Sequence, residues 1–287
     1  MAWHVLGEND GARLQALAQE LKLHPLHVED CLHGGQNAKL EDDADYVFAI
    51  LKPVEMKADG SLAIGDFDIF LSRDYLITYE ETGCEGLRSL IAKLQGVGEL
   101  PGGEIFHRLF DGVVDSYNPV LDRYSEQIDA IEDEVVSKPE PRLLERIFAM
   151  KRGLIEMRRV LAQTRDVAGH LLRTDCPHLD PKLRPYFRDV HDHLTRHIET
   201  VEMSRDLLSG AMDIYLSSVA NRTNRTMKVL ALLSAAVLPT LVVSSFFGMN
   251  FKVMPLIESP SGLAYSMAGS AVATVVLAVV LLWRRWL

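Results

Sequence analysis

Residues 229–250 read VLALLSAAVLPTLVVSSFFGMN, and residues 263–283 read LAYSMAGSAVATVVLAVVLLW. Neither apolar run, 229–247 or 263–283, contains a charged residue. Each is about twenty residues long, the length that a helix needs to cross roughly 30 Å of hydrocarbon. The two runs therefore predict a hairpin of two transmembrane helices, joined by a loop that begins Gly248-Met249-Asn250, with the residues before it in water.

Charged residues near the two apolar runs predict the orientation of this hairpin in the membrane. Basic residues lie before the first run and after the second, at Arg222, Arg225, Lys228, Arg284 and Arg285, whereas the loop has Lys252 balanced by Glu258. The positive-inside rule predicts both termini in the cytoplasm and the Asn250 loop outside. No apolar signal segment opens the chain, so we expect the soluble part to stay in the cytoplasm. The membrane that holds the hairpin is then expected to be the inner or plasma membrane.

Composition excludes one class of partner. The formal net charge is −10, and phosphate backbones need basic patches, so nucleic acid is not expected to bind. An acidic soluble part suits cations, although acidity also serves solubility. Cys31, Cys84 and Cys176 are widely spaced and form no CxxC pair, which predicts ordinary reduced thiols.

The soluble part divides into two predicted regions. In residues 1–100, apolar spacing predicts helices over 10–23, 24–32 and 86–95, and strands over 46–53, 67–71 and 75–80, with Ser72-Arg73-Asp74 as a hairpin turn. This is a small α/β domain. Residues 101–228 predict a helical stalk: a helix over 104–136, bent or broken at Pro119, a second over 142–173, and a third from about 184.

The third stalk helix has no strong stop before the Asn250 loop. About sixty residues at 1.5 Å each give a helix on the order of 90 Å, so one element is expected to join the stalk to the transmembrane region, residues 229–287. The fold class expected is an α-rich α+β membrane protein.

Short motifs along the whole chain resemble the CorA family of divalent-cation transporters. They are LHPLHVED at 23–30, PYFRDVHDH at 185–193, YLSS at 215–218, NRTN at 221–224, MKVL at 227–230, GMNF at 248–251, MP at 254–255 and WL at 286–287. The resemblance implies a funnel-shaped homopentamer in which the long helix lines a pore. Family members that prefer magnesium often carry Glu after the Met-Pro pair. Here that position is Leu256.

A stripe of the long helix fits such a pore. Asp213, Ser217, Ala220, Asn224, Met227, Ser234, Leu238 and Ser245 recur at steps of three and four residues. Small and polar residues of this kind also serve helix packing in membranes, so periodicity alone leaves both interpretations open. The resemblance favours the pore, with Asp213 as an acidic ring near the cytoplasmic mouth and Met227, Leu230 and Leu238 as a hydrophobic gate that excludes ions by dewetting.

Asn250, with Gly248 and Met249, is the expected selectivity loop. Mg²⁺ releases its waters reluctantly, and a ring of neutral amide oxygens can accept hydrogen bonds from a hydrated ion. Weak, uncharged ligands also let the ion leave. An Asn that caps the helix is the structural alternative, and both roles are compatible.

Asp189 falls in the stretch that matches the family's cytoplasmic metal site. The resemblance implies that Mg²⁺ binds there between acidic groups of neighbouring subunits. At a high cytoplasmic concentration of Mg²⁺, the bound ion would close the transport path. Asp66 and Asp68 are the candidate partner carboxylates, and an ordinary surface Asp is the alternative. His193 and His197, with His191 nearby, have a spacing that suits Zn²⁺ or Co²⁺, although a solvated histidine face is commoner.

The function expected is passive uptake of Mg²⁺, with Co²⁺ and Ni²⁺ as further candidates, and Mg²⁺ as both cargo and regulator. The membrane potential supplies roughly 4.6 kcal/mol per 100 mV for a divalent ion. No nucleophile–base pair or P-loop is present, so neither an enzyme nor ATP-driven transport is expected. The alternatives are a zinc transporter of the same architecture and a non-conducting, membrane-anchored metal sensor.

Overall fold

The computed structural model describes residues 1–81, 84–98, 100–173, 176–249 and 260–283. These residues form two compact units, Met1–Met212 and Asp213–Leu287, here called the N-terminal and C-terminal units. The three-part division at residues 100 and 228 stays a prediction.

A five-stranded mixed sheet organises the first part of the N-terminal unit. Its order is β1-β7-β6-β3-β2, where β1 is Ala2–Gly7, β2 Lys39–Asp42, β3 Val47–Leu51, β6 Phe67–Leu71 and β7 Tyr75–Glu80. The β6–β7 hairpin confirms the predicted turn. Only β1 and β7 pair in parallel. A turn at Ala58-Asp59 connects a separate hairpin of β4 (Val54–Met56) and β5 (Leu62–Ile64).

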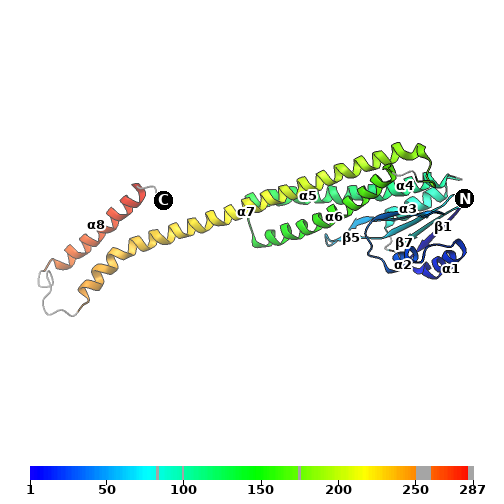
Figure 1. Cartoon of the computed structure of the whole chain (residues 1–287). Helices are drawn as coiled ribbons and strands as arrows, with labels where there is room; N and C mark the ends of the chain where they lie inside the picture. The colour runs from blue at the N-terminus through cyan, green and yellow to red at the C-terminus, as the bar shows by residue number, and fades with distance from the viewer. Residues whose placement is uncertain (82–83, 99, 174–175, 250–259, 284–287) are drawn as a thin grey trace. The chain divides into compact units, whose positions relative to one another are not determined.

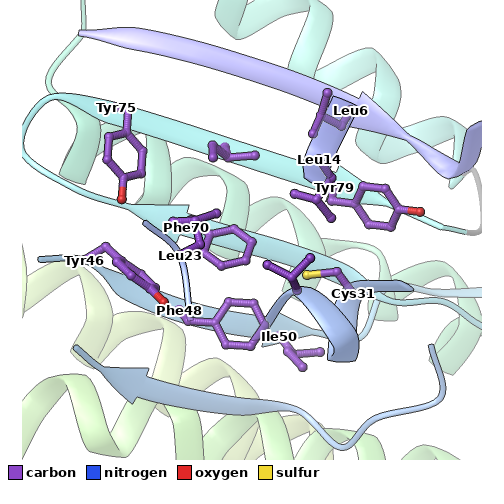
Figure 2. Packing of buried hydrophobic residues seen from close by; sticks show 12 residues of the cluster. Leu6, Leu14, Leu23, Cys31, Tyr46, Phe48, Ile50, Phe70, Tyr75 and Tyr79 are labelled. Carbon is purple, nitrogen blue, oxygen red and sulfur yellow. The ribbon is translucent and has the colours of Figure 1, made fainter. Parts of the chain in front are cut away.

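Helices cover both faces of this sheet (Figure 1). Helices α1 (Gly11–Leu21) and α2 (Pro25–His33) close one face, where Leu14, Cys31, Phe48 and Phe70 belong to one buried cluster (Figure 2). Helices α3 (Glu85–Gln95) and α4 (Gly102–Asp115) lie on the other side. Because β3, β6 and β7 have both faces covered, every one of their residues is buried, as expected of strands inside an α/β/α sandwich.

The helix predicted over 104–136 is two helices. Helix α4 ends at Asp115 and α5 (Tyr117–Ser137) begins two residues later, so Pro119 is the third residue of α5. A proline there loses no hydrogen bond, because the first N–H groups of a helix have no partner, but its ring would clash with the carbonyl of Asp115 in a continuous helix. The break predicted near Pro119 is confirmed, and it lies at Ser116, three residues before the proline.

Two long helices complete the stalk. Helix α6 spans Pro141–Arg173 and packs on α5 so closely that the Tyr124 hydroxyl occupies the place where a Cβ at residue 153 would lie, which requires Gly153. After the short helix η2 (Pro181–Leu183), α7 runs over 64 residues from Arg184 to Phe247, as predicted, with Pro239 inside it.

The C-terminal unit holds the end of α7 and helix α8 (Gly262–Trp283). Among the described residues, one helical stretch, Pro181–Phe247, is long and apolar enough to cross a membrane, with a window of mean hydropathy 2.2. Helix α8 contains a shorter apolar stretch, Ala264–Val280. Both predicted apolar runs are therefore helical.

Candidate functional site

The candidate pore residues occupy exposed positions on α7. Met227 is 63% exposed, Leu230 59% and Leu238 52%, and Asp213 and Asn224 are exposed as well. The described part of the chain leaves more than half of each of these apolar side chains uncovered. The hydrophobic effect would favour covering them with lipid or with another copy of the protein.

Partly covered residues of α7 lie on a different side of the helix. Leu232, Ala235, Pro239 and Val243 are half-buried and follow the same three- and four-residue steps. At about 100° per residue, this half-buried stripe is roughly a third of a turn away from the one with Met227, Ser234 and Leu238. The C-terminal unit therefore leaves the predicted pore stripe open while it partly covers another.

Helix α7 ends just before the expected selectivity loop. The Gly248 N–H donates to the Ser244 carbonyl at 3.0 Å, and the Met249 N–H donates to the Phe246 carbonyl at 3.4 Å, so the last turn tightens. Met249 is 52% exposed. Asn250, the central residue of the predicted loop, lies outside the described residues.

Asp189 lies in the first turns of α7, and its side chain is 70% exposed. Its carboxylate is 3.6 Å from Nε2 of His193, one helical turn further on. This side chain is available to a cation at the surface, because no contact at hydrogen-bond distance is recorded for it within the described part of the chain.

Asp111 of α4 is a carboxylate near Asp189 that the sequence reasoning missed. Burial raises the pKa of Asp111, and the charges of Asp115 and Asp189 act in the same direction, whereas His107 and His193 lower it. Two helices, α4 and α7, thus bring acidic side chains into electrostatic contact. The signal in the sequence was the pair Asp111 and Asp115, one helical turn apart on an amphipathic helix.

Asp66 and Asp68 do not meet Asp189. Asp66 is 5% exposed, forms an ion pair with Lys52 and accepts from the Gln36 N–H at 3.3 Å. Asp68 in β6 is 1% exposed, and burial raises its pKa to about 8. Both carboxylates are therefore buried within the N-terminal unit. The pairing of Asp189 with either residue stays a prediction, which the burial of both carboxylates within one chain does not favour.

The histidines of α7 do not assemble a metal site. Asp189 pairs with His193, and Nδ1 of His191 lies 3.6 Å from a carboxylate oxygen of Asp192, so each of these pairs contains one histidine. Burial lowers the pKa of His197, and the neighbouring His193 adds to this shift. Within the described ranges, no three His, Cys, Asp or Glu side chains surround one point at metal-binding distance.

Comparisons with known proteins agree with this architecture. Residues 1–284 match the family described as CorA-like Mg²⁺ transporter protein. A cobalt/magnesium transport protein CorA from Thermotoga maritima is 31% identical over 279 residues, which covers 96% of this chain and 80% of the relative. A putative metal ion transporter, YfjQ of Bacillus subtilis, is 28% identical over 235 residues, covering 81% of this chain and 73% of the relative.

The fold is also that of a solved structure. The complete structure of the CorA magnesium transporter from Methanocaldococcus jannaschii matches with a TM-score of 0.84 at 21% identity, over 97% of this chain and 89% of that chain. It shares the N-terminal α/β region, the helical stalk and the apolar C-terminal helices. With a family match that spans 1–284, the protein belongs to the CorA-like Mg²⁺ transporter family and is a membrane transporter, not an enzyme.

Proposed function

We propose that the protein is a passive channel for divalent cations, formed by five copies of the chain around one axis. The observation that carries this proposal is the stripe of α7 in which Asp213, Asn224, Met227 and Leu238 are exposed in the described part of the chain. Two apolar helices cannot enclose an aqueous path alone. Several copies of the stripe would line one, with an acidic entrance and apolar constrictions.

Mg²⁺ and Co²⁺ are the proposed cargo. The Thermotoga relative is a cobalt/magnesium transport protein by name. The amide of Asn250 would bind the water shell of such an ion at the outer mouth, and the membrane potential would drive inward movement. The basic residues flanking the apolar runs support cytoplasmic termini, in a plasma or inner membrane.

Cytoplasmic Mg²⁺ is the proposed regulator, bound by Asp189. Its exposed carboxylate and the nearby Asp111 repel each other, because the charge of Asp189 helps to raise the pKa of Asp111. A divalent cation between α4 and α7 would relieve that repulsion, and a carboxylate from a neighbouring subunit would complete the shell of oxygen ligands that Mg²⁺ requires. A high cytoplasmic concentration of Mg²⁺ would then keep the channel closed.

Uptake of ions into proteoliposomes tests whether the protein conducts and which ions it conducts. Uptake of Mg²⁺, Co²⁺, Ni²⁺ and Zn²⁺ is compared with and without an imposed membrane potential, and with and without a proton gradient. We expect uptake of Mg²⁺ and Co²⁺ that increases with a negative interior. Zn²⁺ uptake that needs a proton gradient would favour the zinc transporter, and no uptake of any ion would favour the non-conducting sensor.

The regulatory site is tested with millimolar Mg²⁺ inside the vesicles. Asp189→Ala should conduct where the wild type is inhibited. Asp192→Ala is the matched control, because Asp192 is on the same helix and its side chain is 66% exposed. Equal inhibition of Asp189→Ala and wild type would rule out Asp189 as the sensor, whatever the channel conducts.

A further inference from the structure

One side of α6 carries exposed apolar and basic side chains together. Phe148 is 45% exposed and Ile155 54%, and Arg152 and Arg159 are exposed as well. These four residues recur at steps of three and four, so they share one side of the helix, here called the α6 face. In the described part of the chain, the ion pairs of α6 are made by other residues, namely Arg146, Arg158, Arg165 and His170.

The α6 face points away from the helices of the same chain that pack on α6. Ile147, Leu154 and Leu161 mark the buried side of α6, and Lys151 next to it donates to Ser209 of α7 at 2.8 Å. At about 100° per residue, the α6 face is roughly 150° away from the buried side. Helices α5 and α7 of the same chain therefore do not cover it.

Exposed side chains such as Phe148 and Ile155 favour a partner. The hydrophobic effect favours covering them, and apolar patches rimmed by charge mark interaction surfaces. Lipid is not the expected cover, because α6 belongs to the N-terminal unit and precedes the residues that we assign to the membrane. Arg152 and Arg159 indicate that the partner carries negative charge at this place.

Helix α5 presents a surface with the required charge. Asp122, Glu126, Asp129 and Asp133 are exposed, lie at steps of four and three residues, and form no ion pair within the described ranges. They are here called the α5 acidic face. This face lies opposite the buried side of α5, which includes Ile128.

The two faces also match in height along the helices. Helices α5 and α6 are antiparallel, and three contacts between them fix their register, namely Tyr117 with Thr164, Tyr124 with Gly153, and Glu134 with Arg146. Between these contacts, Arg152 is nearly level with Glu126, and Ile155 is nearly level with Asp122. Copies related by rotation about an axis parallel to the helices keep equivalent residues at equal heights, so opposite charges would meet.

We propose that the α6 face of one copy binds the α5 acidic face of a neighbouring copy. This inference rests on the proposed assembly of several copies around one axis, and it adds a contact between their stalks. A second copy fits because every copy presents both faces with complementary charges. Exposed ion pairs contribute little to affinity, so the burial of Phe148 and Ile155 supplies most of the attraction. The charges determine which faces pair and at what height.

Cysteine cross-linking of the full chain in detergent tests this contact. Glu126→Cys combined with Arg152→Cys should let a short bis-maleimide join neighbouring copies and give a ladder of covalent multimers on a denaturing gel. Asp133→Cys combined with Arg159→Cys is the matched control and should give no ladder. It uses the same two faces, but at heights that differ by about 18 Å. Each single variant controls for the three native thiols.

The mass of the complex, measured by light scattering, separates this inference from the proposed function. A multimer in which the matched pair cross-links no better than the control pair would overturn this contact and leave the channel proposal standing. A monomeric protein would overturn both. A ladder from the matched pair alone supports the contact.

Charge reversal tests the electrostatic part of the contact. In chains that carry Asp122→Cys with Arg159→Cys, which should also cross-link, Arg152→Glu should slow the reaction about threefold or more. Adding Glu126→Arg should restore the rate, because the opposite charges are then exchanged between the faces. Equal rates in these three proteins would overturn the pairing by charge. All four positions are exposed, so the fold should be kept, and circular dichroism checks it.

Discussion

The sheet of the N-terminal unit and the helices of the C-terminal unit solve the problem of apolar surface in opposite ways. Phe48 and Phe70 are 0% exposed because helices of the same chain cover the sheet on both faces. In the C-terminal unit, Leu241 is 57% exposed, Val242 60% and Val276 56%. The sheet region buries its apolar side chains within one chain, whereas in the C-terminal unit many apolar side chains of α7 and α8 remain exposed.

The comparison shows where each unit obtains its stability. Burial at about 25 cal/mol per Å² stabilises the sheet region from within. In a membrane, the lipid is as apolar as the side chains, so α7 and α8 need no internal core, and backbone hydrogen bonds within each helix become the main requirement. Substitutions of buried core residues in the first unit should therefore act on folding, whereas substitutions on the exposed stripe of the second should act on conduction.

The largest expected effect is loss of conduction in Asn250→Ala. Removing the amide takes away the only side-chain group proposed to bind the ion's water shell at the outer mouth, so divalent-cation uptake into proteoliposomes should fall to background. Asn118→Ala, which changes the same residue type at an exposed position of α5 outside the proposed path, is the matched control and should retain uptake. Unchanged flux in Asn250→Ala would break the assignment of the C-terminal unit to conduction.

Phe70→Ala should destabilise the N-terminal unit by about 3–5 kcal/mol, the usual cost of removing a buried aromatic ring. The ring of Phe70 packs 4.7 Å from that of Phe48 and 5.6 Å from that of Tyr46, centroid to centroid (Figure 2). Thermal unfolding of the detergent-solubilised chain measures the loss. Leu241→Ala should change the melting temperature little, and an equal drop in both variants would contradict the contrast between the units.

Met227→Asp should increase leak through the channel. A charged ring hydrates an apolar constriction, and lowering the barrier by about 1.4 kcal/mol increases flux tenfold. Met227→Leu keeps the constriction apolar and serves as the control, with flux close to that of the wild type. A silent, tightly closed Met227→Asp channel would remove Met227 from the gate.

The smallest expected effect concerns Asp68 and pH. Its folded-state pKa is raised from 3.8 to about 8, so the folded protein binds a proton that the unfolded chain has already lost between these values. Stability from this group is therefore present at low pH and is lost as the pH rises through about 8.

Asp68→Asn cannot ionise and should be more stable than the wild type at pH 8, on the order of 1 kcal/mol or more. The difference between the two proteins should shrink as the pH falls towards 5. Melting temperatures measured across this range give the result. A constant difference in melting temperature between the wild type and Asp68→Asn across this range would show that the pKa of Asp68 is not raised in the folded protein.

The sequence predicted the helices well because their signals are local. Residues at three- and four-residue steps located α1, α2, α3 and α6 within a few positions, and the lack of stops predicted α7 as one element. Strand β1 was missed, because its partner β7 is more than seventy residues away, and Ala2–Gly7 alone shows no alternation. Edge strand β2 was missed for a different reason, since it is short and at most half-buried.

The candidate site was predictable only in part. The positions of the α7 stripe follow from helical period alone, but the environment of Asp189 does not. Asp66 and Asp68 looked available in the sequence because carboxylates are usually exposed. Their burial depends on the helices that cover the sheet, and the approach of Asp111 to Asp189 depends on how α4 packs near α7.

By itself the sequence determined the two apolar helices, their charged flanks and the family, because hydropathy and helical period act over a few neighbouring residues. Only the tertiary structure decided which carboxylates are buried, which faces of α5 and α6 stay exposed, and which side of α7 stays open. The physical reason is that burial and pKa arise from contacts between segments far apart in the chain, and local patterns carry no record of them.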